Sequence, residues 1–412
     1  MVVLNKIAQS FASQSAASIV VGAITFILQI TLARQLGPDS FGTYGIAASI
    51  AGIGFIFQDG GFRSLLYREA THPTQGLPDY LTLFSRALGW NILASGFLLV
   101  LAIGGTLYSA IIGIAVAIMV VTNMGRIVSL DISSLMRAND QFTAEAKWQV
   151  KNRLSVNLLM IVAAFLSNNL IVILACGAVA QLGNLLLSTV RAVLRVPKFA
   201  WNTDIFRICA TLVAIDLVTA LYFRSDVLIM AALGRTREEI GIYAALSRII
   251  EAYIFIVAPM ATIFFRSARL KIANRQATGR ILWLLSTITA VPTLIVLVLS
   301  MHYEEWMIRL IFGTSYQSGA AYLPWVIAAC CAAAPNALLG QVLLANNRER
   351  YFLLAVIGAL IVNLTLNTIL IATRGAAGAA MATFATEASL LLFLAAAFYA
   401  PMKNPAIGKD ER

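Results

Sequence analysis

The sequence has little charge. Asp, Glu, Lys and Arg make up 12% of its 412 residues, whereas soluble domains carry about a quarter. Hydrophobic residues make up 60% of the chain, and the mean hydropathy is +0.83. The charge that is present is mostly positive, with a formal net charge of +11. This composition excludes a soluble globular protein.

Groups that bind metals and nucleotides are also scarce. The chain has two histidines, and its four cysteines lack metal-type spacing. No GxxxxGK[ST] phosphate-binding loop occurs, and no stretch alternates as an outer-membrane strand would. We therefore expect no metal, no cofactor and no ATPase activity on this chain. Helices and closed barrels are the two backbones that can cross a bilayer, so the absence of alternating strands leaves helices.

Apolar residues occur in repeated blocks of about 20 residues, the length that a helix needs to cross the hydrocarbon core. The sequence therefore predicts an all-α polytopic membrane protein with 12 spans. The predicted spans are residues 11–33, 40–62, 83–106, 109–136, 147–167, 170–194, 208–233, 239–265, 280–301, 319–344, 350–372 and 376–400.

Lysines and arginines fall into alternate loops. When charges at span ends are counted with the adjacent loop, 23 of the 30 lie on one side and 5 on the other, while Arg224 and Arg248 remain inside spans. Cytoplasmic loops carry an excess of positive charge, so both termini are predicted to be cytoplasmic. Orientation thus explains the net charge without a nucleic-acid partner. The longest outer loop is residues 300–318, and its charges Glu304, Glu305 and Arg309 are interpreted as a solvated rim.

The two halves share landmarks at an offset of about 199 residues. Gly42-Thr43-Tyr44 near the first outer turn resembles Gly241-Ile242-Tyr243 near the fourth, and Gly37 and Gly234 lie shortly before them. We interpret these matches as a duplication of six spans, with a cleft between the two lobes. Chance similarity of apolar sequence is the alternative. The predicted lobes are residues 1–200 and 201–412.

Four charged residues are predicted at similar depth in the second half. Arg224 and Asp226 lie on the span before the Gly234 turn, and Arg248 and Glu251 lie at i, i+3 on the span after it. Charges in lipid usually face a bundle interior or a wet cavity. One interpretation is a cavity wall for an anionic headgroup, since the planar arginine fork binds two phosphate oxygens at once. The other is structural ion pairs between helices.

Four further charges lie near the cytoplasmic side of the first half. Asp59 and Arg63 are spaced i, i+4 at the end of one span, and Arg126 and Asp131 lie at a similar level on another. They either form a vestibule that collects an anionic substrate or extend to the headgroup region. Two carboxyl groups are candidates for binding a coupling ion: Glu387, near the middle of the last span, and Asp216, on the same span as Arg224. The alternative for Glu387 is a hydrogen bond to a neighbouring helix.

Two motifs carry a resemblance to a known family. Residues 32–44 read LARQLGPDSFGTY, and residues 57–63 read FQDGGFR. Together they resemble the Wzx-type polysaccharide flippase branch of the MOP superfamily, which also contains MATE exporters and lipid II flippases. The match is strongest over residues 30–70, while the similarity in predicted spans covers nearly the whole chain.

The resemblance implies alternating access between two six-helix lobes in the bacterial inner membrane. The implied cargo is an undecaprenyl-pyrophosphate-linked oligosaccharide, such as an O-antigen unit of lipopolysaccharide, that moves from the cytoplasmic to the periplasmic leaflet. The implied partners are the lipid bilayer, a coupling proton or sodium ion, and other polysaccharide assembly proteins. Asp59, Arg63, Arg248 and Glu251 correspond best to the family's positively charged cavity. The first span lacks a mid-helix charge, which departs from the lipid II flippase pattern.

Two other functions stay open from the sequence. One is a cation-coupled drug exporter of the same superfamily, against which the turn motif argues. The other is a membrane-embedded glycan-processing enzyme, which needs a catalytic acid, base or metal at the membrane surface. Glu304, Glu305 and Arg309 in the outer loop form no such constellation, so no enzymatic activity is expected.

Overall fold

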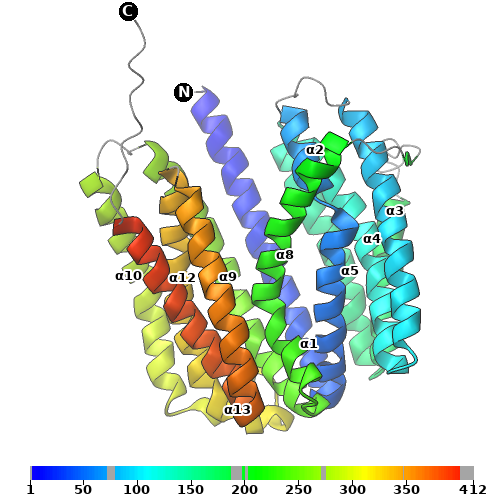
Figure 1. Ribbon diagram of the computed structural model, residues 1–412, viewed down its shortest axis with the longest axis vertical. Helices are drawn as coiled ribbons and strands as arrows, with labels where there is room; N and C mark the ends of the chain where they lie inside the picture. Colours follow the sequence, from blue (N-terminus) through cyan, green and yellow to red (C-terminus); the bar gives the residue numbers. More distant parts are fainter. Residues whose placement is uncertain are drawn as a thin grey trace, which may run out of the picture.

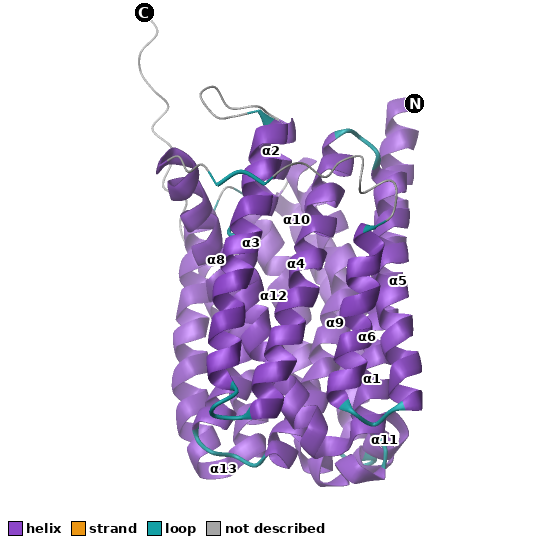
Figure 2. Ribbon diagram, turned by 90° about the vertical axis from the view of Figure 1, so that its right-hand side faces the viewer, coloured by secondary structure: helices purple, strands orange, loops and turns teal. Residues whose placement is uncertain are grey.

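The computed structural model is a bundle of long helices (Figures 1 and 2). It describes residues 2–71, 79–186, 197–199, 203–270, 275–346 and 348–399, and no strand occurs among them. The helices are α1 (Val2–Asp59), α2 (Phe62–Thr71), α3 (Tyr80–Gly105), α4 (Ala110–Ala138), α5 (Phe142–Leu166), α6 (Leu170–Leu185), α8 (Thr203–Ala232), α9 (Arg237–Leu270), α10 (Arg275–Ser300), α11 (Glu304–Ile311), the 3-10 helix η1 (Thr314–Tyr322), α12 (Leu323–Ala345) and α13 (Glu349–Tyr399). The predicted lobe boundary at residues 200–201 and the last part of the span 170–194 lie outside the described residues.

Helices α1 and α13 each consist of two segments joined at a glycine. The break in α1 is at Gly37 (φ 70°) and is followed by Pro38, and the break in α13 is at Gly375 (φ 58°). Glycine adopts positive φ at little cost, and proline suits the first turn of the segment that follows. Each pair of segments forms a hairpin (Figure 1). Both breaks fall where the sequence predicts a turn.

The outer surface of the bundle is apolar. Phe97, Val100, Phe165 and Val179 are each 65–67% exposed. Among the described residues, six helical stretches are long and apolar enough to cross a membrane, and α10 with α11 adds a pair bent by 105°. A water-soluble protein rarely exposes so much apolar surface. The chain is therefore a multi-pass membrane protein.

Buried amides connect neighbouring helices. Gln58 on α1 is fully buried and donates to Ser95 Oγ on α3 at 2.8 Å. Asn367 on α13 donates to Asn363 Oδ1 at 3.1 Å, and that oxygen also accepts from Ser225 Oγ on α8 at 2.8 Å. Such hydrogen bonds satisfy polar groups that lipid cannot.

The predicted loop at residues 300–318 is wrong, because most of this segment is folded as α11 and η1. Its charges Glu305 and Arg309 are exposed, as the interpretation of a solvated rim expects. Ile308, Phe312 and Tyr316 are fully buried, and Tyr316 Oη donates to Ala33 O on α1 at 2.9 Å. Arg34 Nε donates to Ile311 O at 2.8 Å. The buried residues recur every fourth position, so the segment has an apolar face that covers the first hairpin of α1.

The closest approach between α1 and α9 is made by two glycines, Gly42 and Gly241. A Cβ at Gly42 would overlap the carbonyl oxygen of Arg237, and a Cβ at Gly241 would overlap that of Pro38. On each helix the carbonyl that makes the contact lies four residues before the glycine. The contact is therefore symmetric, and its equivalent residues are 199 positions apart, as in the sequence landmarks. We call this contact the glycine seam.

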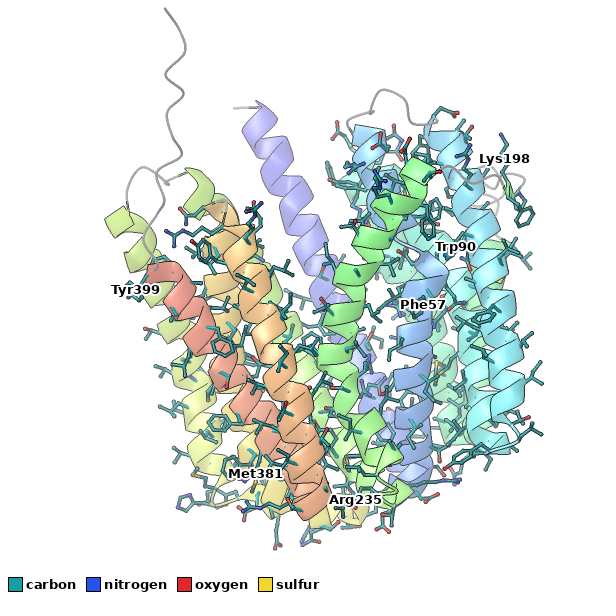
Figure 3. The ribbon with its side chains drawn as sticks, viewed as in Figure 1. Phe57, Trp90, Lys198, Arg235, Met381 and Tyr399 are labelled. Carbon is teal, nitrogen blue, oxygen red and sulfur yellow. The ribbon has the colours of Figure 1, made fainter. Side chains whose placement is uncertain are left out.

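The glycine seam lies in the first turns of α9, which begins two residues after Arg235, and Arg235 lies at one end of the bundle (Figure 3). Lys198 lies at the opposite end of the bundle (Figure 3). The charge count also assigns Arg235 and Lys198 to opposite sides of the membrane. The beginning of α1 and the end of α13 both lie toward the end opposite the seam (Figure 1).

Candidate functional site

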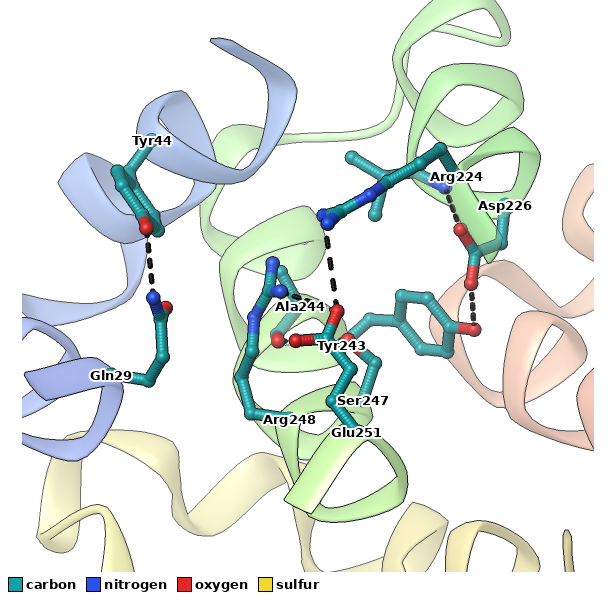
Figure 4. Close-up of polar contacts among 10 residues, drawn as sticks. Gln29, Tyr44, Arg224, Asp226, Tyr243, Ala244, Ser247, Arg248 and Glu251 are labelled. Carbon is teal, nitrogen blue, oxygen red and sulfur yellow. Dashed lines mark hydrogen bonds and ion pairs between the residues drawn. The ribbon is translucent and has the colours of Figure 1, made fainter. Parts of the chain in front are cut away.

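Helices α8 and α9 bring two arginines to one carboxylate (Figure 4). Arg248 Nη1 donates to Glu251 Oε1 at 2.6 Å, and Arg224 Nη1 lies 3.8 Å from the same oxygen. The predicted i, i+3 pairing of Arg248 with Glu251 is therefore confirmed. One negative charge between two positive charges leaves this group, which we call the arginine pair, with a net positive charge.

Asp226 lies near the arginine pair, and its charge acts on both arginines without a direct ion pair. Its carboxylate accepts from the Tyr243 hydroxyl and, at 2.7 Å, from its neighbour's backbone at Val227 N. The Tyr243 hydroxyl also lies 3.0 Å from Thr383 Oγ1. Asp226 thus joins α8 to α9 (Figure 4), and the Tyr243 hydroxyl extends this link to α13. Tyr243 is a partner that the sequence interpretation missed, although a buried tyrosine hydroxyl in a membrane span needs one.

Glu387 is hydrogen-bonded to two neighbouring helices. Tyr222 Oη on α8 donates to Oε1 at 2.8 Å, and Asn336 Nδ2 on α12 donates to Oε2 at 2.7 Å. The alternative interpretation of Glu387, a hydrogen bond to a neighbouring helix, expected this arrangement. The side chain is 5% exposed, so it is shielded from lipid by polar groups on three helices.

The carboxylates of Asp226, Glu251 and Glu387 line a single cavity. Its volume is about 40 Å³, and Asn363, Thr383 and Thr386 add polar side chains to its wall. We call it the carboxylate cavity. The sequence placed these three acidic residues on three different spans, and the structure brings them together.

Arg63 connects the two halves of the chain. It lies on α2, after a break at Gly60 (φ 58°) and Gly61 (φ 76°). Arg63 Nε lies 3.9 Å from Asp59 Oδ1, and Nη2 lies 3.9 Å from Asp216 Oδ2 on α8. Asp216, a candidate for ion binding, is thus an ion-pair partner with a side chain that is 40% exposed.

The break after Asp59 has a packing reason. Trp90 Nε1 on α3 donates to Phe57 O at 2.6 Å, and both residues are labelled in Figure 3. A Cβ at Gly60 would overlap that indole nitrogen. The glycine is therefore required both by its positive φ and by the tryptophan packed against it.

Arg126 has no carboxylate partner among the described residues. Its guanidinium lies over the Phe55 ring at 5.1 Å, and its buried Nε has no hydrogen-bond partner there. Arg224 Nε lies 3.6 Å from the position that a Cβ on Gly52 would take. Gly52 and Phe55 are one turn apart on α1, so Arg126 from the first half and Arg224 from the second approach the same stretch of helix.

Arg153 on α5 is a cavity candidate that the sequence interpretation missed. It was counted as a charge of the cytoplasmic loop, but it lies within α5, is half-buried, and has no ion pair with any described carboxylate. The positive charges of Arg153, Arg63 and Arg224 all act on Arg126. Four arginines from both halves therefore converge. Arg63 pairs with Asp59 and Asp216 and Arg224 pairs with Glu251, whereas Arg126 and Arg153 have no ion pair with a described carboxylate.

This arrangement can bind a multiply charged anion. Arginine forks bind phosphate oxygens in pairs, and a site shielded from water strengthens such contacts. No group of three or more His, Cys, Asp or Glu in the described part of the chain could hold a metal ion.

Comparisons with known proteins give the following similarities. A family model described as polysaccharide biosynthesis protein matches residues 31–321. No curated protein sequence matches. Among solved structures, the lipid II flippase MurJ in an inward closed conformation is 14% identical, with a TM-score of 0.74 over 93% of this chain and 86% of its own. An inward-facing multidrug resistance MATE family transporter of the MOP superfamily is 10% identical, with a TM-score of 0.70 over 93% and 97%. An outward-facing one is 12% identical, with a TM-score of 0.57 over 94% of each chain. At these identities the likeness concerns the fold alone.

Proposed function

Because the chain belongs to the polysaccharide biosynthesis protein family, whose model covers residues 31–321, we propose that it is a lipid-linked oligosaccharide flippase. It moves an undecaprenyl-pyrophosphate-linked oligosaccharide from the cytoplasmic to the periplasmic leaflet of the bacterial inner membrane. The movement occurs by alternating access and is coupled to a proton or sodium ion. Other polysaccharide assembly proteins supply the cargo and receive it.

The proposed topology has 12 spans in two six-helix lobes, with both termini cytoplasmic. The hairpins of α1 and α13 contribute two spans each, and α3, α4, α5, α6, α8, α9, α10 and α12 contribute one each. Support for the lobes comes from the symmetric contact at the glycine seam, which relates equivalent positions of the two halves. Support for the orientation comes from the positive-inside rule.

The observation that carries the proposal is the convergence of arginines from both halves, two of which lack an ion pair. Arg126 and Arg153 form none with a described carboxylate, and the arginine pair shares Glu251. A diphosphate carries several negative charges that must leave water to cross the membrane, and these arginines can replace that water. A site for cationic drugs would instead require surplus negative charge.

Arg126→Gln tests this proposal without leaving a carboxylate unpaired. A charge-assisted hydrogen bond contributes about 1.5–3 kcal/mol, so we expect a roughly 10- to 100-fold lower transport rate at limiting substrate. The measurement is surface glycan in cells that depend on this chain, with the amount of inserted protein determined in parallel. Arg374→Gln is the matched control, because Arg374 is exposed at the Gly375 turn. Full glycan output from Arg126→Gln would overturn the cationic cavity.

A cation-coupled exporter remains the second candidate. The carboxylate cavity favours it, because Asp226, Glu251 and Glu387 could attract a cation, and the MATE transporters share the fold. The discriminating experiment expresses the chain in drug-sensitive cells. Drug resistance without any effect on surface glycan would replace the flippase proposal.

Glu387 is the proposed proton carrier. Glutamine at this position can still accept a hydrogen bond but cannot bind and release a proton, so Glu387→Gln is expected to make transport insensitive to an imposed pH gradient. The measurement is flipping in proteoliposomes with the gradient set in either direction. Asp216→Asn is the comparison, since Asp216 already pairs with Arg63 and is expected to keep the response. If Glu387→Gln keeps the wild-type response to the gradient, Glu387 is not the carrier.

A further inference from the structure

A second cavity lies between α9, α12 and α13, beyond the carboxylate cavity. Its volume is about 250 Å³, and its lining is mainly apolar. Ala333, Ala337 and Gly340 of α12 form one wall, and Ile254, Val257 and Phe352 form the facing wall. We call it the α12 groove.

The α12 groove runs along one face of α12. The α12 residues that line it run from Ala333 to Leu344 at spacings of three and four, which places them on one face of the helix. At the α-helical rise per residue this face is about 16 Å long. Ala333, Ala337 and Gly340 have a small side chain or none, and the Phe352 ring packs over Gly340. A mainly apolar strip of this length fits a hydrocarbon chain better than a charged solute.

One residue joins the α12 groove to the carboxylate cavity. Asn336 lines the groove, is 6% exposed, and donates through Nδ2 to Glu387 Oε2 at 2.7 Å, while Glu387 lines the cavity. Asn336 Oδ1 is buried and has no hydrogen-bond partner among the described residues. The groove therefore has a polar end with an unused acceptor, directly beside the charged cavity. A ligand with a polar head and an apolar chain could occupy both spaces.

The groove also lies at the depth that a substrate from the cytoplasmic leaflet requires. It extends from the middle of α12 toward the end of that helix, away from η1, which packs against the α1 hairpin near the seam. In the proposed orientation this is the cytoplasmic half of the bundle. A headgroup among the arginines could thus reach the centre of the membrane while its chain still points toward the leaflet from which it came.

We propose that the α12 groove binds the isoprenoid chain of the lipid-linked substrate. This inference rests on the proposed flippase function and adds a site for the part of the substrate that the arginines cannot hold. The chain enters the groove from the cytoplasmic leaflet and lies along the Ala337–Gly340 floor. The diphosphate lies next to it, on the far side of Asn336.

The test uses a polyprenol that carries a photoreactive diazirine at its far end and has no phosphate. The full-length protein is irradiated with this probe in nanodiscs, and the labelled peptides are mapped by mass spectrometry. We expect labelling within residues 333–344 and on the facing part of α9. Ala337→Leu fills the floor of the groove with three more carbons. Each buried methylene is worth about a fourfold change in affinity, so excluding three of them should lower the labelling by roughly 60-fold at limiting probe concentration.

Gly96→Leu is the control, because a Cβ at Gly96 on α3 would meet nothing within 4 Å. It should leave the labelling of residues 333–344 unchanged. Equal labelling of α3, α6 and α12, or full labelling of Ala337→Leu, would overturn the proposal, since the probe would then be dissolved in the bilayer. Labelling of the groove by a diazirine phospholipid that polyprenol does not displace would also overturn it, because the occupant would be an ordinary acyl chain.

Competition separates this inference from the proposed function. Polyprenyl diphosphate should displace the probe at lower concentration than polyprenol does, and Arg126→Gln should remove that advantage. If both compounds compete equally while Ala337→Leu still blocks labelling, the groove is supported and the arginine site for the diphosphate is refuted. If the diphosphate competes better but the label lies elsewhere, the flippase proposal is supported and the groove is refuted.

Discussion

Arg248→Ala is expected to reduce surface glycan by roughly 100-fold, because each charge-assisted hydrogen bond contributes about 1.5–3 kcal/mol and the guanidinium can form two to a diphosphate. Arg248 is 5% exposed, and its Nη1 donates to Glu251 at 2.6 Å. Its Nε is buried without a partner among the described residues. The side chain therefore has unused hydrogen-bonding capacity within the site. The measurements are surface glycan and, separately, the amount and thermal stability of inserted protein.

A second variant distinguishes substrate binding from structural pairing. If Arg248 only neutralises Glu251, then Arg248→Ala/Glu251→Ala should recover glycan output, since it removes both members of the buried pair. If Arg248 binds the substrate, the double variant should fold normally and remain inactive. Arg248→Lys keeps the charge but loses the fork, so we expect intermediate activity. Recovery in the double variant would assign the pair to structure alone.

Gly42→Leu is expected to stop transport by preventing closure of the glycine seam. The new side chain would occupy the position of the Arg237 carbonyl, and that carbonyl belongs to the α9 backbone, so the two helices must separate. In the proposed orientation the seam closes the periplasmic side. The carboxylate cavity would then stay accessible from the periplasm, and the cycle could not return to its cytoplasmic-facing state.

Thiol labelling measures this opening directly. A cysteine at position 247, where Ser247 lines the carboxylate cavity, should react faster with a membrane-impermeant maleimide from the periplasmic side in the Gly42→Leu background. Gly96→Leu again serves as the control for a larger residue on a free face. Unchanged labelling together with normal glycan would show that the seam does not gate this side.

The features of the fold that depend on local sequence could be predicted. Gly37 followed by Pro38, and Gly375 between two apolar runs, indicate turns because each residue restricts the backbone in a known way. The folded cap of α11 and η1 was missed, although Ile308, Phe312 and Tyr316 recur at helical spacing. The charges Glu304, Glu305 and Arg309 on the other face of the segment suggested a solvated loop.

The site could be predicted only where its contacts are local. The spacing of Arg248 and Glu251 indicated their pairing, because i and i+3 are neighbours on any helix. The link between Asp226 and Tyr243 and the position of Arg153 depend on how separate helices pack, which spacing within one helix does not show. Arg153 was missed as a cavity residue because it was counted with a cytoplasmic loop. A charge near the end of a span satisfies the positive-inside rule whether it faces headgroups or a cavity.

The glycine seam limits how the two halves can diverge. Where side chains meet, an enlargement on one partner can be offset by a reduction on the other. At the seam each glycine faces main chain, namely the carbonyl oxygens of Arg237 and Pro38, and a main-chain atom cannot be made smaller by any substitution. A bulky residue at either glycine therefore has no compensating change at the contact itself. Only a shift of a whole helix, through turns such as those at Gly37 and Gly234, could accommodate it, so the duplicated halves cannot drift independently here.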